Sequence, residues 1–353
     1  SGATEKAAAL LEQAEQLANR IGSRPIVGLC RMIGAVSAVH SGRSEDAERF
    51  AVEAEEILSE QRGLSAWPLN IARVYHISAL IDEGRIVDLC RVSREFIDDA
   101  LDRGNLFAAT MFRSGWSTLL WLSNDDVSGA KDALQKALAQ CPDGVFYIPH
   151  YNCLLARGMI DLYAGDNGAA FNHVDAVWPT LERSLVLRIR SVRVRCLRMR
   201  AACAIAAARD GGDQKRLLAI AETLAKALER ERHYSVVSNN AKAKLLRAGI
   251  ASTRGDMPIA LEHLSVAVDR FEECGSEFWH AVSLRRKGQV IGGDEGKKSI
   301  RLADDWMATQ GIKNPARMTA AFIPGFPLGK EGIQTLRIRT PLSMRDTRPS
   351  PGE

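Results

Sequence analysis

The sequence predicts an all-α fold, arranged as a solenoid of antiparallel helix pairs. Apolar residues recur with a period of about 3.6 along nearly the whole chain, and the strict alternation of a β-strand is rare. Short breaks rich in glycine and aspartate interrupt this pattern at intervals of about 40 residues, a spacing typical of helical repeats. The chain has 353 residues, which is more than one compact core usually holds. Either an elongated repeat array or two domains would account for that length.

Each predicted helix ends at a short turn. The first helix begins almost at once, in the run EKAAALLEQAEQLA at residues 5–18, an entry typical of a segment cut from a longer protein. Glycine in the following breaks permits a tight turn, and aspartate or serine can cap the next helix. The six breaks lie at residues 42–47, 84–89, 124–130, 165–170, 211–216 and 255–260.

Small residues follow these turns, where two helices must approach each other closely. Ala47, Ala51 and Ala54 do so in one unit, and Gly158 precedes the turn at Gly165 in another. This pattern resembles the tetratricopeptide (TPR) repeat over roughly residues 3–310. The resemblance implies a right-handed superhelix, and the long period is similar to the sensor regions of bacterial signalling ATPases of the maltose-regulator type. A non-repeating all-α domain is the alternative.

The pattern changes near the C-terminus. A last helix is followed by Asn314-Pro315, which starts a short helix, because proline fits an early helical position. Trp306, Met318 and Phe326 can cover the apolar end that a repeat array leaves open. This ending resembles that of large bacterial proteins in which a serine/threonine kinase and a STAND-type ATPase precede TPR-like repeats. The predicted organisation is a solenoid over residues 1–310, a capping segment over 311–326 and a flexible tail over 327–353.

Composition excludes several classes of protein. Forty-seven basic residues nearly balance forty-three acidic ones, and a net charge of +4 does not indicate a nucleic-acid-binding protein. The seven cysteines are scattered without a C-x-x-C pair, which is typical of reduced thiols in the cytoplasm. No apolar run is long enough to cross a membrane.

The sequence contains no motif for catalysis, a metal or a cofactor. The run GGDEGKKS at residues 292–299 lacks the glycine-to-lysine spacing of a phosphate-binding loop. His150, Cys153 and Cys141 lack the second ligand pair of a closed zinc site. We therefore expect no catalytic residue, metal ligand or cofactor. The six tryptophans are expected to pack between helices, with Trp279 and His280 partly exposed at a helix start.

The run SLVLRIRSVRVRCLRMRAAC at residues 184–203 is the most unusual segment. It holds six arginines and no acidic residue. Leu185, Ile189, Val192, Cys196, Met199 and Cys203 are spaced by alternating steps of four and three, which predicts one helix with a buried seam. Arg190 and Arg198 then lie opposite the seam and the other four arginines on its flanks. The candidate partner-binding residues are Arg188, Arg190, Arg193, Arg195, Arg198 and Arg200.

Three interpretations of these arginines stay open. They form a solvated helix face whose stems cover apolar neighbours, a patch that recognises an acidic partner, or a nucleic-acid contact. The third has little support, because no aromatic residues are interleaved with the arginines.

Two hypotheses on function follow. The first is a non-catalytic interaction and sensor module that binds a protein or peptide partner, or a small ligand, in the concave groove of the solenoid. The C-terminal resemblance implies that binding regulates kinase and ATPase domains upstream in the same polypeptide. The alternative is a stand-alone TPR-type receptor for a peptide signal; the single helix expected in residues 1–24 argues against it, because an effector segment is lacking.

Overall fold

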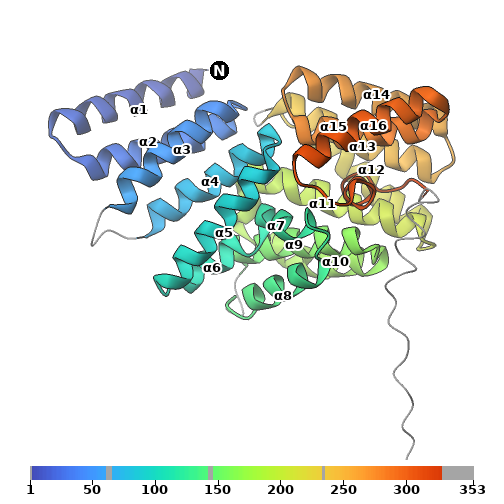
Figure 1. The fold of residues 1–353 in the computed structure, drawn as a ribbon, viewed down its shortest axis with the longest axis horizontal. Helices are drawn as coiled ribbons and strands as arrows, with labels where there is room; N and C mark the ends of the chain where they lie inside the picture. Colours follow the sequence, from blue (N-terminus) through green and yellow to red (C-terminus); the bar gives the residue numbers. More distant parts are fainter. Residues whose placement is uncertain (1, 61–65, 142–145, 233–234, 328–353) are drawn as a thin grey trace, which may run out of the picture.

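The computed structural model describes residues 2–60, 66–141, 146–232 and 235–327. In these residues the chain forms seventeen α-helices and two short 3₁₀ helices, and no strand (Figure 1). The prediction of an all-α fold is therefore confirmed. The tail predicted for residues 327–353 lies outside the described residues, except for Pro327.

The helices follow one another with short connections, and most consecutive helices pack together. The first group is α1 (Gly2–Arg20), α2 (Arg24–His40), α3 (Ser44–Ser59), α4 (Trp67–Glu83), α5 (Ile86–Asp102) and α6 (Leu106–Phe112). The middle group is η1 (Gly115–Thr118), α7 (Leu119–Leu122), α8 (Val127–Leu138), α9 (Ile148–Ala164), α10 (Asn167–Arg183), η2 (Leu185–Arg188) and α11 (Arg190–Arg209). The last group is α12 (Gln214–Glu229), α13 (Val236–Thr253), α14 (Met257–Glu273), α15 (Glu277–Ile291), α16 (Gly293–Thr309) and α17 (Pro315–Phe322).

All six breaks predicted from the sequence contain a turn between two helices. Three aspartates cap the helix that follows, because their side chains accept a hydrogen bond from a free backbone N–H in its first turn. These are Asp126 before α8, Asp213 before α12 and Asp256 before α14. The turn chemistry read from the sequence is thus confirmed at these positions.

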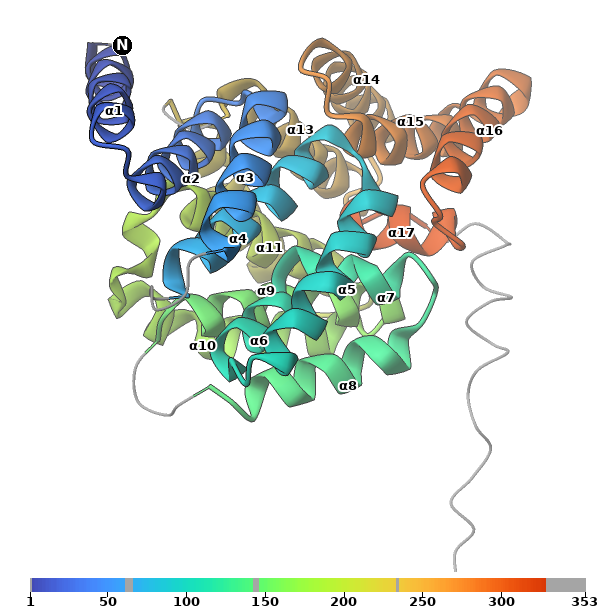
Figure 2. The same ribbon diagram turned by 60° about the vertical axis from the view of Figure 1, so that its left-hand side comes forward.

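The array curls so that α4 and the start of α5 contact the C-terminal helices. In Figures 1 and 2, α1–α4 and α13–α16 lie on the same side of the molecule, with α8–α10 at the opposite side. Helix α15 packs against α4, and the backbone N–H of Ile86 donates a hydrogen bond of 3.0 Å to the side chain of Gln310. Segments more than two hundred residues apart in the sequence are therefore in direct contact.

Helix α17 packs against α9, α15 and α16, and Figure 2 shows it between α16 and α7. Asn314 caps α17 by accepting a hydrogen bond from the N–H of Arg317, so the predicted helix start at Asn314-Pro315 is confirmed. Arg317 reaches across to Asp125 at 2.8 Å and to the carbonyl oxygen of Tyr163 at 3.1 Å. The segment thus covers apolar side chains in the middle of the array as well as those of the last helix pair.

The arginine-rich run is not one helix. Residues Leu185–Arg188 form the 3₁₀ helix η2, the backbone of Ile189 is extended, and α11 begins at Arg190. Leu185 and Ile189, which the sequence placed in the buried seam, are 68% and 40% exposed. The prediction was wrong here because Ser184 caps η2 with a local hydrogen bond, which competes with continuation of the helix.

The buried seam continues correctly within α11. Val192, Cys196, Met199 and Cys203 are all buried, as their spacing predicts. The face opposite this seam, however, is also covered, because α11 packs against α9, α10, α12 and α13. This central position decides the environment of each arginine on α11.

In the part of the chain that the structure describes, no helix combines the length and the apolar character that a membrane crossing requires.

Candidate functional site: the arginines of α11 and the interior they line

Two of the six arginines hold α11 to its neighbours. Arg193 pairs with Glu231 at 2.6 Å, and Glu231 is itself buried. Arg200 pairs with Asp175 of α10 at 2.6 Å, and its guanidinium lies 4.3 Å from the ring centre of Trp178. These two contacts satisfy the charges of both arginines and assign them to packing.

Two other arginines are exposed at the start of α11. Arg188 and Arg190 lie on either side of the exposed Ile189, near the exposed Leu185. No acidic side chain among the described residues forms an ion pair with either arginine. We call Leu185, Arg188, Ile189 and Arg190 the exposed basic patch.

The remaining two arginines point into the molecule. Arg195 and Arg198 are three residues apart and lie on one face of the helix. The guanidinium of Arg195 lies 5.6 Å from the ring centre of Trp116. That of Arg198 lies 4.9 Å from Trp279 on α15 and 5.7 Å from Phe322 on α17.

A lysine completes this group. The ammonium of Lys242 on α13 lies 5.1 Å from the ring centre of Trp279, so Lys242 and Arg198 share one aromatic partner. We call Arg195, Arg198 and Lys242 the interior basic cluster. The sequence pattern indicates the two arginines but not Lys242, because nothing local distinguishes this lysine from others on amphipathic helices.

Burial and mutual repulsion disfavour positive charge in the interior basic cluster. Burial lowers the pKa of Arg198 to about 10, and Arg195 contributes to the shift. Burial lowers the pKa of Lys242 to about 8, with further lowering by Arg198 and Arg195, while Asp82 acts in the opposite direction. Arg198 and Lys242 therefore hold their protons less tightly than exposed side chains of the same type.

Two predictions about exposure are wrong in this region. Arg198 was placed opposite the buried seam and expected at the surface, yet it is only 6% exposed. Trp279 was expected to be partly exposed, yet it is 1% exposed, because Phe271, Phe278 and Phe322 surround it. Tertiary packing is the reason in both cases: side chains of α15 and α17 cover Arg198, and side chains of α14 and α17 cover Trp279.

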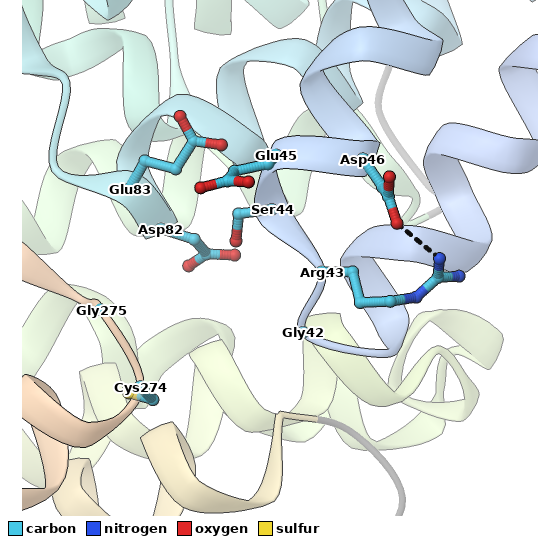
Figure 3. A pocket seen from close by; sticks show the side chains of 9 residues that line it. All are labelled: Gly42, Arg43, Ser44, Glu45, Asp46, Asp82, Glu83, Cys274 and Gly275. Atoms are coloured by element: carbon cyan, nitrogen blue, oxygen red, sulfur yellow. Dashed lines mark hydrogen bonds and ion pairs between the residues drawn. The ribbon is translucent and has the colours of Figure 1, made fainter.

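An acidic pocket lies beside the interior basic cluster (Figure 3). Its volume is about 360 Å³, and it is formed by the α2–α3 turn, the end of α4 and the α14–α15 turn. Figure 3 shows the carboxylates of Glu45, Asp82 and Glu83 on one side of the pocket, with Cys274 across from them. Asp82 and Cys274 are also the groups whose charges favour the protonated form of Lys242, so the pocket and the cluster are neighbours.

The candidate metal ligands do not form a metal centre in the described residues. The sulfur atoms of Cys141 and Cys153 lie 4.0 Å apart. No group of three histidine, cysteine or acidic side chains that could hold a metal ion occurs in the described ranges.

The arginines of α11 thus provide two different surfaces for negative charge. The exposed basic patch combines arginine with exposed apolar side chains, and the interior basic cluster combines three cations with aromatic rings. No protein-family model matches this chain, and no curated protein is significantly similar to it. These two surfaces are therefore the evidence on which its function is argued.

Proposed function

We propose that this chain is a non-catalytic interaction and sensor module, built as a right-handed superhelical solenoid of the TPR type with a period of about 40 residues. In this proposal it binds an acidic protein or peptide partner through the exposed basic patch. The observation that carries the proposal is the pair Arg188 and Arg190, exposed and unpaired among the described residues, beside exposed Leu185 and Ile189. Arginine and apolar side chains together are typical of interfaces, and the guanidinium fork matches a carboxylate.

The proposal extends to the partner's effect. Binding controls serine/threonine kinase and STAND-type ATPase domains of the same polypeptide, a view supported by the resemblance of the C-terminal segment around Asn314-Pro315. Seven free cysteines support a cytoplasmic location, because disulfides form in oxidising compartments and cytoplasmic thiols stay reduced. The sequence of the complete gene product tests this part: kinase and ATPase motifs ahead of residue 1 support it, and a gene product without them contradicts it.

Peptide selection tests the partner class. A displayed library of short peptides, selected on the purified chain, is expected to yield peptides rich in aspartate and glutamate with apolar neighbours. The double variant R188E/R190E should bind the selected peptides at least about tenfold more weakly, which corresponds to roughly 1.4 kcal/mol of binding free energy. Arg198 is unsuitable for this test, because it is buried and its reversal would disturb the core.

A matched control reverses two exposed positive charges elsewhere. Lys298 and Arg301 on α16 are exposed, so K298E/R301E makes the same change in net charge at a distant surface. This control should bind the selected peptides like the wild type. Equal binding by R188E/R190E contradicts the proposal, and so does selection of peptides without acidic residues. Binding of short nucleic acids with a steep loss of affinity in salt would favour the nucleic-acid interpretation instead.

A further inference from the structure

Arg198 differs from the other buried arginines of the described residues because its guanidinium has no hydrogen-bond acceptor. Four arginines are buried in the described part of the chain, and three of them donate hydrogen bonds to a carboxylate, an amide or a carbonyl oxygen. These are Arg73 to Asp99 at 2.6 Å, Arg285 to Asp304 at 2.7 Å, and Arg286 to Gln289 at 2.7 Å and Ile323 at 2.8 Å. The guanidinium of Arg198 has no hydrogen bond or ion pair with any residue that the structure describes.

The aromatic partners of Arg198 do not replace those bonds. Trp279 and Phe322 contact the guanidinium through their ring faces. A guanidinium carries five N–H donors in its own plane, and a ring face is a poor substitute for the oxygen acceptors that they require. None of the nitrogen atoms of Arg198 is among the unbonded polar atoms that the described structure seals from solvent. Its donors are therefore not fully sealed from solvent, although the residue is only 6% exposed.

Two further cations increase the cost of this arrangement. Arg195 and Lys242 lie near Arg198 and repel its charge, and a desolvated guanidinium without an oxygen acceptor, as at Arg198, costs several kcal/mol. The nearby carboxylate of Asp82 opposes the shift at Lys242 but lies within no ion pair with it among the described residues. An anion placed among the three side chains would offset repulsion and supply the missing acceptors.

We infer that the interior basic cluster is a binding site for a small anion with at least two negative charges on oxygen atoms, such as a phosphate monoester or a dicarboxylate. The guanidinium of Arg198 binds two of its oxygens through the fork, and Lys242 and Arg195 neutralise the remaining charge. The ligand is a small molecule, because Arg198 is too deeply buried for a protein surface to reach. This site is separate from the exposed basic patch and goes beyond the proposed function.

Calorimetric titration tests the inference directly. Glycerol phosphate and succinate are the two probes, each titrated into the wild-type chain at an ionic strength held constant with chloride. At least one probe is expected to bind at a single site. The probe that binds more tightly shows whether the site prefers a phosphate monoester or a dicarboxylate. Lys242→Met keeps the volume of the side chain and its contact with Trp279, and should weaken binding by about tenfold or more, as loss of one charge-assisted contact does.

Two variants keep the test decisive. Arg195→Gln should also weaken binding. Arg195 is less buried than Arg198, so this variant replaces Lys242→Met in the test if circular dichroism shows that Lys242→Met is unfolded. The control R188Q/R190Q removes two positive charges from the exposed basic patch and should bind the probe within about twofold of the wild type. Failure of peptide binding in that control, with probe binding intact, concerns the proposed function alone.

The pH dependence gives a second measurement. Asp82 on α4, Arg195 and Arg198 on α11 and Cys274 after α14 are the charged or titratable groups that act on Lys242, whose pKa is about 8 in the free protein. An anion binds the protonated lysine, so affinity in the wild type should fall as the pH rises above about 8. Lys242→Met should lack this fall. The inference is overturned if neither probe binds more tightly than chloride, or if Lys242→Met and Arg195→Gln both bind like the wild type.

Discussion

Glu83 shows how position alters the chemistry of a single residue. It ends α4 at the edge of the acidic pocket, where Glu48 and Glu45 are close and Arg85 is its positive neighbour at 3.4 Å. Burial and the charge of Glu48 raise the pKa of Glu83 to about 7, although Arg85 acts in the opposite direction. The carboxyl group is therefore protonated in the folded chain at a pH where the unfolded chain has already lost that proton.

This shift predicts a pH-dependent stability. Because the pKa is raised in the folded state from 4.5, protonated Glu83 stabilises the fold at low pH, and this contribution is lost as the pH rises from 4.5 through about 7. The loss amounts to at most about 3 kcal/mol. Glu83→Gln should remove it, so the variant gains stability relative to the wild type between pH 5 and pH 8 in urea denaturation.

A matched change on the surface provides the control for Glu83. Glu95 on α5 is exposed, and among the described residues its ion pair is with the exposed Arg91, so Glu95→Gln should leave the pH dependence of the wild type unchanged. If the free energy of unfolding of Glu83→Gln follows the wild-type curve at every pH, the raised pKa is not present in solution.

At the scale of helices and turns, the same residue type has different roles at different places. Gly84 lies in the turn between α4 and α5, and Gly255 lies in the turn between α13 and α14. Both have a positive φ, of +81° and +86° respectively. A Cβ atom at Gly84 would lie 2.7 Å from the backbone nitrogen of Phe278, because α15 packs directly against this turn. A Cβ atom at Gly255 would meet nothing within 4 Å.

The two turns therefore predict different costs for the same substitution. Gly255→Ala should destabilise the fold by about 1 to 2 kcal/mol, the cost of a left-handed backbone with a side chain. Gly84→Ala adds a steric clash with the backbone in the first turn of α15 and should cost roughly 1 to 3 kcal/mol more. Chemical denaturation of both variants measures the difference. Equal losses would show that α4 and α15 are not in close contact.

At the scale of the whole molecule, the C-terminal segment is joined to the middle of the array. Arg317 joins the C-terminal segment to the middle of the array through Asp125 and the carbonyl oxygen of Tyr163, and its guanidinium lies 4.8 Å from the ring centre of Tyr163. The hydroxyl of Tyr163 donates a hydrogen bond of 3.0 Å to the same carboxylate of Asp125. One arginine therefore links three parts of the chain: α17, the turn before α8 and the end of α9.

Removing the Arg317 side chain should weaken the packing of the C-terminal segment against the middle of the array. Arg317→Met is expected to cost about 2 to 3 kcal/mol, because Asp125 loses a partly buried, charge-assisted partner. Hydrogen exchange should accelerate in α17 and at the N–H of Lys313, which donates to the carbonyl oxygen of Ser123. Arg270→Met, which removes an exposed pair with Glu273, should change stability by less than about 1 kcal/mol. Unchanged exchange in α17 would show that Arg317 does not hold this segment.

The sequence by itself determined the helices and their turns. The period of apolar residues, the glycines and the capping aspartates Asp126, Asp213 and Asp256 act within a few residues of the chain, so local pattern is enough to predict them. The same local reasoning identified the buried seam from Val192 to Cys203.

Only the tertiary structure decided which arginines are available for binding. A helix with one apolar seam normally turns its opposite face to water, and on that rule Arg198 belonged at the surface. In this molecule α13, α15 and α17 bring Lys242, Trp279 and Phe322 to that face from much later in the chain. The spacing of apolar residues shows which face of a helix is apolar. It does not show whether a helix from a distant part of the chain covers the polar face. Packing of α13, α15 and α17 against that face is what makes the interior basic cluster different from the exposed basic patch.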